Sequence, residues 1–403
     1  MKKKVISCCL VAALLIGGFM GIDRFQPEER SISIVNARAE PSEKETGLKL
    51  NAKAAVLMDA ASGKILFAQD AHKRLPPASV TKVMTMLLIL EACEDGKISM
   101  KDTVTISERA ASMGGSQMYM EPGEQHTVEE LLMGVAMVSA NDGCVALAEH
   151  LAGSVEMFVE RMNQRARQLE MKDTNFVNTN GLPVANHYTS AYDIAIMSRH
   201  LLRFPKTKEW FTRWQATIKV GLPGKEKEFG LTNTNRLIKQ YSGAIGVKTG
   251  FTQDAGYCLS GAAERGGTRL VAVILGCKTS KIRFAEISKM FDYGFANYES
   301  VKIGEKGKLQ KSIRIQKGAP AKITAVLEEE KSVLVKKGKK GSVKTKIKMD
   351  STMRPPIKKG QQVGELVVYQ DGTEIGRFPM VAAEKAKKAS IKDLYIQMMR
   401  KII

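Results

Sequence analysis

The sequence has few residues of the kinds that bind metals, and none of them are arranged for it. Of 403 residues, five are histidine and six are cysteine, and neither an H-E-x-x-H nor a C-x-x-C pattern occurs. Zinc sites in proteins are usually built from such closely spaced ligands. Repeats of 20–50 residues and heptads are also absent, which excludes solenoids and coiled coils. We therefore expect a globular protein that needs neither a metal nor another cofactor.

Four cysteines lie beyond the first 39 residues, at Cys93, Cys144, Cys258 and Cys277. Each stands alone in an apolar stretch, which favours buried free thiols that pack as small hydrophobic side chains. Disulfide pairing is the alternative for an exported protein.

Acidic residues are scarce toward the end of the chain. The whole sequence has 62 Lys and Arg against 42 Asp and Glu, and residues 301–403 alone hold 25 basic and 10 acidic side chains. Residues 40–300 are nearly neutral. An excess of positive charge indicates an anionic partner. Because a nucleic-acid enzyme would carry this charge around its active site, we expect no nucleic acid and attribute the charge to an appended module.

The N-terminus has the pattern of an export signal. Lys2–Lys4 precede an apolar run from Val5 to Ile22, and Ala37–Ala39 offers a small-x-small cleavage site. We assign residues 1–39 to this signal. The run is 18 residues long, so an uncleaved membrane anchor is the alternative. In both cases the rest of the chain lies outside the cytoplasmic membrane.

Strand patterns begin and end the next region, and helix patterns fill its middle. Residues 40–298 are therefore predicted to form one α/β domain, whose sheet pairs N- and C-terminal pieces and is accompanied by a helical subdomain. The expected strands are 54–58, 65–68, 246–250, 256–262 and 270–276, and the expected helices are 80–93, 127–152, 189–202 and 280–298.

The last hundred residues change in character. Short β-rich runs separated by turns predict a small antiparallel β domain over 299–383, with strands at 313–315, 323–327, 332–335, 343–349 and 363–369. Residues 384–403 then form a basic linker and a helix with one apolar face, which is typical of a helix lying on an anionic membrane surface. Packing of this helix on the β domain is the alternative.

Ser79 and Lys82 form an S-x-x-K motif at the start of a very apolar segment. Positions i and i+3 share one face of a helix, so the amine can reach the hydroxyl. Burial lowers the pKa of a lysine, and the neutral amine is then available as a base. A lysine that extends to the surface is the alternative.

Two further tripeptides follow in order, Ser139-Ala140-Asn141 and Lys248-Thr249-Gly250, the second on an expected strand. Each motif alone is common. The ordered set of three is the signature of penicillin-binding proteins and class A β-lactamases.

On these motifs the chain resembles the low-molecular-mass penicillin-binding proteins, which are serine-type D-alanyl-D-alanine carboxypeptidases. The resemblance spans about residues 40–400 and includes the order of signal, catalytic domain, small β domain and amphipathic helix. Gly114–Gln117 and Asn233–Arg236 resemble the Gram-positive, sporulation-associated branch. The implied fold is that of the penicillin-binding protein/β-lactamase transpeptidases.

The resemblance also implies a role for each motif residue. Ser79 would attack the D-Ala-D-Ala bond of a peptidoglycan stem peptide and form an acyl-enzyme, with Lys82 as base. Ser139 would relay a proton to the leaving nitrogen, with Lys248 nearby. Asn141 would orient Lys82 and hold the substrate amide. β-Lactam antibiotics would acylate the same serine.

The substrate would bind along the third motif. Thr249 and Lys248 would hold the terminal carboxylate, helped by Arg283, and Gly250 would belong to the same binding strand. The backbone N–H groups of Ser79 and Phe251 would form the oxyanion hole. The protein would work at the outer face of the cytoplasmic membrane, held peripherally by its last helix.

A β-lactamase on the same fold is the nearest alternative. It would need a deacylating glutamate in an E-x-x-L-N stretch between the second and third motifs, and no glutamate there has this context. A non-catalytic wall-binding protein would be expected to lose a motif residue, whereas every motif position is filled. A zinc-dependent D-Ala-D-Ala peptidase is disfavoured because the sequence has no cluster of zinc ligands.

Overall fold

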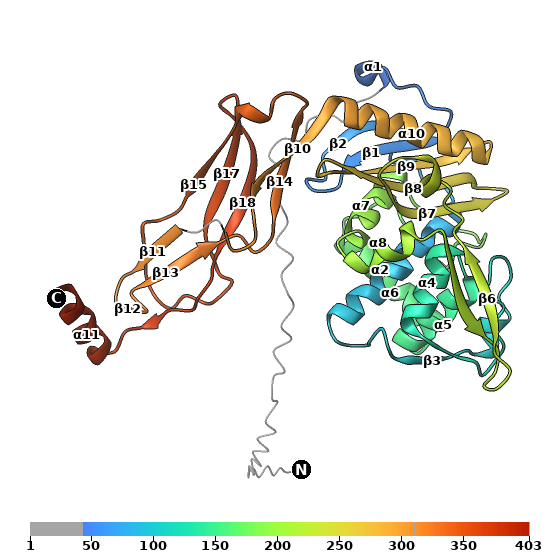
Figure 1. Ribbon diagram of the computed structural model, residues 1–403, viewed down its shortest axis with the longest axis horizontal. Coiled ribbons are helices and arrows are strands. Elements are labelled where there is room, and N and C mark those ends of the chain that lie inside the picture. Colours follow the sequence, from blue (N-terminus) through green and yellow to red (C-terminus); the bar gives the residue numbers. More distant parts are fainter. Residues whose placement is uncertain (1–42, 309–310, 403) are drawn as a thin grey trace, which may run out of the picture. The chain divides into compact units, whose positions relative to one another are not determined.

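The computed structural model describes residues 43–308 and 311–402 (Figure 1). The signal predicted for residues 1–39 lies outside these ranges. Within them, no helix has the length and apolar character that crossing a membrane requires.

A five-stranded antiparallel sheet is the centre of the first region. Its strands are β1 (Ala54–Asp59), β2 (Ile65–Gln69), β7 (Ala244–Thr252), β8 (Gly256–Arg265) and β9 (Thr268–Cys277), in the order β2-β1-β9-β8-β7. β1 pairs with β9 along its whole length, from Ala54 opposite Leu275 to Asp59 opposite Leu270. The expected pairing of N- and C-terminal pieces is confirmed.

Both faces of this sheet are covered, which explains why β1 is apolar from Ala54 to Met58. Ala55 and Leu57 belong to the core under α10 (Ser280–Asn297), whereas Val56 and Met58 belong to the core of the helical subdomain. Figure 1 shows α10 on one face of the sheet and the helices between residues 82 and 212 on the opposite face. Because successive side chains of a strand point to opposite faces, a strand buried on both sides must be apolar at every position.

The helical subdomain fills the middle of the chain. Its main helices are α2 (Lys82–Glu94), α4 (Val128–Met137), α5 (Asn141–Ala152), α6 (Val155–Gln168), α7 (Ala191–Leu201) and α8 (Pro205–Thr212). Side-chain caps fix several starts: Thr127 and Glu130 form a reciprocal capping box on α4, and Ser190 caps α7. The expected helical pair over 127–152 is thus two helices separated by the second motif.

Shorter elements complete this region. They are α1 (Glu43–Thr46), the 3₁₀ turn η1 (Ala78–Thr81), β3 (Thr103–Thr105), α3 (Glu108–Ala111), β4 (Gln125–Thr127), β5 (Gln215–Val220), β6 (Lys227–Thr232) and α9 (Leu237–Gln240).

The C-terminal β region has its own apolar core. Its six-stranded sheet has the order β15-β17-β18-β13-β11-β16. β10 pairs with β14, and β12 with β19, outside this sheet. The strands of the whole region are β10 (Tyr298–Gly304), β11 (Lys311–Ile315), β12 (Gly318–Ala319), β13 (Lys322–Val326), β14 (Lys331–Lys336), β15 (Val343–Lys348), β16 (Thr352–Met353), β17 (Gln362–Gln370), β18 (Thr373–Ala382) and β19 (Lys387–Lys388), and a second 3₁₀ turn, η2, spans Lys340–Ser342. The sequence did not predict β10, β18 or the two-residue strands β12, β16 and β19.

The chain continues into α11 (Ile391–Ile402), which the apolar periodicity predicted. Its contact with the β region includes a hydrogen bond from the Gln397 side chain to the Gly318 carbonyl oxygen. Ile391 is 88% exposed, and Tyr395 and Met398 are more than half exposed. Most of the apolar face of α11 is therefore not covered by the β region.

Candidate active site

Ser79 and Lys82 lie at the junction between η1 and α2, and this differs from the expected continuous helix over 80–93. The segment from Ala78 to Thr81 is a 3₁₀ turn, and the α-helix begins at Lys82. Side chains at i and i+3 eclipse one another in a 3₁₀ turn. The amine Nζ of Lys82 accordingly lies 3.0 Å from the hydroxyl oxygen of Ser79.

The Lys82 side chain is fully buried, so it does not extend to the surface. Its amine also donates to the backbone carbonyl oxygen of Asn180 at 2.7 Å. Burial lowers the pKa of Lys82 from 10.5 to about 8, although the nearby Asp142 acts in the opposite direction. A substantial share of this amine is therefore neutral near physiological pH.

Packing beneath the turn fixes the position of Ser79. The His187 ring accepts a hydrogen bond from the Val177 N–H at Nδ1, so its Nε2–H donates to Thr81 Oγ1 at 2.8 Å, and this hydroxyl donates to the Ala78 carbonyl oxygen. Gly181 lies so close that a Cβ there would be 1.8 Å from the same carbonyl oxygen. Ala78 itself has a φ of 49°, a left-handed conformation that non-glycine residues seldom adopt.

Ser139 lies between α4 and α5, and Asn141 is the first residue of α5. In the part of the chain that the structure describes, each has a buried oxygen without a hydrogen-bond partner: Oγ of Ser139 and Oδ1 of Asn141. The Asn141 amide donates to the carbonyl oxygen of Gly114 at 2.6 Å. Among the described residues the Lys82 amine contacts Ser79 and the Asn180 carbonyl oxygen, and the orientation of Lys82 by Asn141 stays a prediction. Buried polar atoms without partners are uncommon in proteins, and the Asn141 Oδ1 is available to a substrate amide.

The third motif lies on β7, directly beside the turn that carries Ser79. A Cβ at Gly250 would lie 2.9 Å from the Pro77 carbonyl oxygen and 3.1 Å from the Ser79 nitrogen, so only glycine permits this approach. Lys248 is buried and donates to the Thr249 carbonyl oxygen at 3.0 Å. Burial, together with the charge of Lys82, holds the pKa of Lys248 well below its usual value.

Arg283 projects from α10 to the same strand. One Nη donates to the carbonyl oxygens of Gly250 and Cys258, both at 3.1 Å, and its Nε is buried without a partner. Burial lowers the pKa of Arg283 to about 10, so the side chain is still charged at neutral pH. Phe251 is half exposed and stacks on Tyr257 with ring centroids 4.3 Å apart.

Thr234 is a site residue that the sequence analysis did not single out. Its hydroxyl lies 2.9 Å from that of Thr249, and its backbone N–H donates to the Met137 carbonyl oxygen. Thr234 belongs to the stretch Asn233–Arg236, where polar residues alternate between buried and exposed. In the sequence all four residues are polar, so no pattern indicated that Thr234 faces Thr249.

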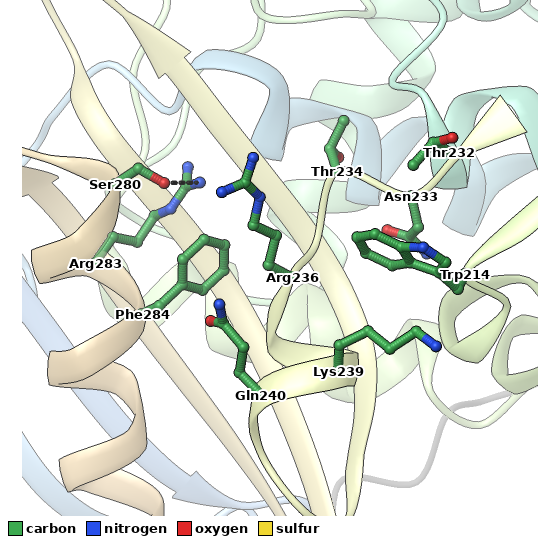
Figure 2. A pocket seen from close by; sticks show the side chains of 10 residues that line it. All are labelled: Trp214, Thr232, Asn233, Thr234, Arg236, Lys239, Gln240, Ser280, Arg283 and Phe284. Atoms are coloured by element: carbon green, nitrogen blue, oxygen red, sulfur yellow. Dashed lines mark hydrogen bonds between the residues drawn. The ribbon is translucent and has the colours of Figure 1, made fainter.

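An open pocket of about 700 Å³ lies next to the third motif, with Thr234 and Arg283 in its lining (Figure 2). It is lined by Trp214, Thr232, Asn233, Thr234, Arg236, Lys239, Gln240, Ser280, Arg283 and Phe284. Among the described residues, no group of three His, Cys, Asp or Glu side chains is placed to hold a metal ion.

The first and third motifs are therefore in direct contact at Ser79, and the charge of Asp142, next to the second motif, acts on Lys82. A nucleophile with a buried amine base, a second buried lysine and an arginine form an arrangement suited to acyl transfer from a substrate that ends in a carboxylate.

Comparisons with known proteins agree with this arrangement. Residues 38–279 match the D-alanyl-D-alanine carboxypeptidase family, and residues 298–388 match the C-terminal domain of penicillin-binding protein 5. The chain is 45% identical over 340 residues to D-alanyl-D-alanine carboxypeptidase DacF of Bacillus subtilis, covering 84% of this chain and 86% of the relative. It is 36% identical over 334 residues to DacA of Haemophilus influenzae, covering 81% and 83%.

A solved structure is also similar. Penicillin-binding protein 5 from Haemophilus influenzae superimposes with a TM-score of 0.69 at 34% identity, over 84% of this chain and 98% of that one. The sequence motifs, the mixed α/β fold with its C-terminal β region and these relatives agree, and the chain belongs to the D-alanyl-D-alanine carboxypeptidase family of serine peptidases, the low-molecular-mass penicillin-binding proteins.

Proposed function

We propose that this protein removes the terminal D-Ala from peptidoglycan stem peptides through an acyl-enzyme on Ser79. The observation that carries the proposal is the 3.0 Å contact between Ser79 Oγ and the fully buried amine of Lys82. A lysine with a pKa of about 8 is poised to accept the hydroxyl proton near neutral pH.

Acylation begins when Ser79 Oγ attacks the carbonyl carbon between the two D-Ala residues and Lys82 takes its proton. The backbone N–H groups of Ser79 and Phe251 stabilise the oxyanion, and each such donor typically contributes about 3 kcal/mol to the transition state. The C–N bond then breaks, and the leaving nitrogen receives a proton through Ser139 and Lys82. The unpartnered Oγ of Ser139 supports this relay role.

The third motif binds the terminal carboxylate of the substrate. We assign this carboxylate to the Thr249 hydroxyl, with Lys248 and Arg283 supplying positive charge. The Arg283 Nε has no partner in this structure, which supports an anion at that point. Gly250 lets the strand lie against η1, and Asn141 Oδ1 accepts the substrate amide.

Penicillin would acylate the same serine, but the adduct would turn over slowly. The D-Ala of the peptide departs and leaves space for a hydrolytic water, whereas the opened β-lactam keeps its amine tethered in the site. No glutamate in an E-x-x-L-N context is present to activate a water from another side. This argument favours a carboxypeptidase over a β-lactamase.

The domain assignment remains part of this proposal: signal over 1–39, catalytic domain over 40–298, β domain over 299–383, and linker with anchor helix over 384–403. The protein acts outside the cytoplasm, as its cell-wall-acting relatives do. We infer that α11 holds it at the outer face of the membrane, because its apolar face is largely exposed and lysines precede it.

The direct test is to incubate the purified protein with a pentapeptide ending in D-Ala-D-Ala and to follow D-Ala release beside covalent labelling by a fluorescent penicillin. Both should occur in the natural protein, and both should be lost in Ser79→Ala, with Ser112→Ala at an exposed serine as the control. Undiminished labelling of Ser79→Ala would overturn the nucleophile. Recovery of the unmodified mass within seconds of stoichiometric penicillin would instead indicate a β-lactamase.

A further inference from the structure

We propose that six exposed lysines of the C-terminal β region bind a linear phosphodiester polymer of the cell wall, at a surface separate from α11. We name these residues the lysine strip: Lys336, Lys337, Lys339, Lys340, Lys344 and Lys346. This inference goes beyond the proposed function, because the lysine strip contains no residue of the Ser79 site.

The lysine strip lies in a segment of the chain that has no acidic residue. Residues 331–349 contain neither Asp nor Glu. Among the described residues, no lysine of the strip forms an ion pair, and the Lys337 amine donates to the Phe295 carbonyl oxygen. Glu299 brings one carboxylate to this turn, where it accepts from the Gly338 N–H at 2.8 Å. Most of the positive charge is therefore available to an anionic partner.

The strip follows one continuous stretch of backbone. Four of its lysines lie at the end of β14 and in the turn that includes η2. On β15, Val343 and Ile347 pack against the core of the β region, so Lys344 and Lys346 project from the outer face. Side chains two residues apart on a strand are separated by about 7 Å. A row of exposed charges of this kind suits an extended anion better than a compact one.

Protection of a sheet edge explains only part of the strip. β15 lies at one edge of its sheet, beside β17 (Figure 1), and lysines on edge strands discourage pairing with another chain. That role accounts for Lys344 and Lys346, but not for the four lysines that precede β15. Lys348 is left out of the strip because it has a carboxylate nearby: Arg377 and, more weakly, Lys348 lower the pKa of Glu374. An anionic partner accounts for all six lysines.

The order of the strands separates the lysine strip from α11. β15 is at one edge of the sheet, whereas α11 contacts the turn after β11, where the Gln397 side chain donates to the Gly318 carbonyl oxygen. Between these two strands lie β17, β18 and β13. Neighbouring strands are about 4.8 Å apart, so the sideways separation is about 19 Å.

The register of the strands separates the two surfaces lengthwise as well. Val343, at the start of β15, lies opposite Gln370, which pairs with Thr373 at the start of β18. β13 meets the other end of β18, where Ala325 lies opposite Ala382. The length of β18 between these two ends is about 30 Å. The turn of the lysine strip and the attachment of α11 thus lie at opposite ends of this strand.

This separation assigns the strip and the helix to different anions. The attraction of an anionic lipid surface falls off within a Debye length, about 8 Å at physiological salt. A lipid surface held at α11 attracts the lysines that directly precede that helix, whereas the lysine strip lies several Debye lengths away. Outside the cytoplasmic membrane, a wall polymer with a phosphate in each repeat supplies negative charge at such a distance from the lipid.

The choice of side chain also fits a flexible polymer. All six residues of the strip are lysines and none is an arginine. An ammonium group binds phosphate as a point charge, without the fixed two-bond geometry of a guanidinium group. Contacts of this kind tolerate phosphates that shift along the strip. Binding then holds the enzyme in the layer that contains its substrate.

The test measures binding of the natural protein to a lipid-free, fluorescently labelled poly(glycerol phosphate) chain by anisotropy over a range of salt concentrations. A quadruple variant removes four charges of the strip: Lys339→Gln, Lys340→Gln, Lys344→Gln and Lys346→Gln. The matched control removes four exposed charges elsewhere in the same β region: Lys311→Gln, Lys322→Gln, Lys358→Gln and Lys359→Gln.

The quadruple variant should bind the polymer about tenfold or more weakly, and the control should stay within about twofold of the natural protein. The slope of log affinity against log salt should also become shallower by about 2 to 3 in the quadruple variant, because fewer counterions are released. Release of D-Ala from a soluble pentapeptide should be unchanged in both variants, since the strip is not part of the Ser79 site.

A second arm separates the polymer from lipid. The quadruple variant should cosediment with anionic phospholipid vesicles as the natural protein does, and a protein ending at Ala383 should lose the vesicles but keep the polymer. Loss of vesicle binding in the quadruple variant would assign the strip to the membrane and overturn the inference.

Two further outcomes would overturn it. They are equal polymer affinity in the quadruple variant and the natural protein, and an equal loss of affinity in the quadruple variant and the control, which would indicate net charge alone. Failure of the natural protein to release D-Ala would reject the proposed function and leave the polymer measurement valid.

Discussion

The amine of Lys82 lies inside the protein, where its described hydrogen-bond partners are a hydroxyl and a backbone carbonyl oxygen. Neither partner is a carboxylate, so burial is not balanced by an ion pair. This is the physical reason that the amine loses its proton more easily than a surface lysine, and it converts an ordinary cation into a base.

Acylation by penicillin should therefore become faster as pH rises through about 8. Only the neutral amine accepts the Ser79 proton, and about a tenth of it is neutral one pH unit below its pKa. Below pH 8 the rate should fall about tenfold per pH unit. Stopped-flow labelling between pH 6 and 9, with a β-lactam whose own charge is constant in that range, measures this. A flat profile would show that Lys82 is not the base.

His187 makes a second prediction, on stability. Burial lowers the pKa of His187 from 6.5 to about 4, so the folded protein resists protonation that the unfolded chain accepts. The unfolded state binds more protons between these values, and stability is therefore complete above pH 6.5 and is lost as pH falls toward 4. The loss is on the order of 3 kcal/mol of unfolding free energy.

Urea unfolding at pH 6.5 and at pH 4 checks this. The natural protein should lose more stability between the two than His187→Gln, which has no titrating ring. Ser112→Ala, at an exposed serine, is the control and should behave as the natural protein does. Equal losses in His187→Gln and the natural protein would contradict the assignment.

At the scale of elements, η1 is held between β7 on one side and the segment containing Gly181 on the other. Both contacts are backbone to backbone, and both depend on a missing Cβ. The nucleophile therefore owes its position to two glycines that are distant in sequence.

Gly181→Ala should displace η1 and abolish penicillin labelling. The new Cβ would lie 1.8 Å from the Ala78 carbonyl oxygen, and overpacking of this kind costs about 3 kcal/mol or more. Gly153→Ala is the matched control: Gly153 has a φ of +80° against +86° at Gly181, but no atom lies within 4 Å of its Cβ position. It should cost only the backbone strain, about 1 kcal/mol. Thermal unfolding and labelling of both variants separate the two effects.

Periodicity sufficed for the main elements because their burial is regular. The apolar run of β1 with the turn after it, and the apolar helices around the second motif, could be predicted in this way. η1 could not, because four residues do not distinguish a 3₁₀ turn from the first turn of an α-helix. β18 was missed because Gly376 and Pro379 interrupt it, and both are unusual inside a central strand.

The motif residues were found by spacing, but their partners were not. Asn180 is 98 residues from Lys82, and Thr234 is 15 residues from Thr249 on a separate segment. Such contacts arise from tertiary packing, which no local pattern encodes. The contact of the Asn141 amide with the Gly114 carbonyl oxygen, 27 residues away, is of the same kind.

At the scale of the whole molecule, the positive charge and the exposed face of α11 belong to the same end of the chain. A protein ending at Ala383 should keep its activity on soluble peptides and lose affinity for anionic vesicles, because both the apolar face and the preceding lysines are removed. Cosedimentation with vesicles of anionic and of neutral lipid measures this. Equal binding of the two proteins to anionic vesicles would contradict the anchor.

The pairing of β1 with β9 determines when the active site can form during synthesis of the chain. Ser79 is made early, but the strand that carries Lys248 comes 169 residues later, and β1 cannot complete its pairing before residues 270–275 exist. At a synthesis rate of about 5–20 residues per second, that interval is roughly 10 to 30 s. During it the emerging chain has a serine hydroxyl but neither an oxyanion hole nor a carboxylate site. The nascent protein is therefore inert toward both peptide and penicillin until the last strand of the sheet has been made, and a chain arrested before β9 would be a dead enzyme with an intact S-x-x-K motif.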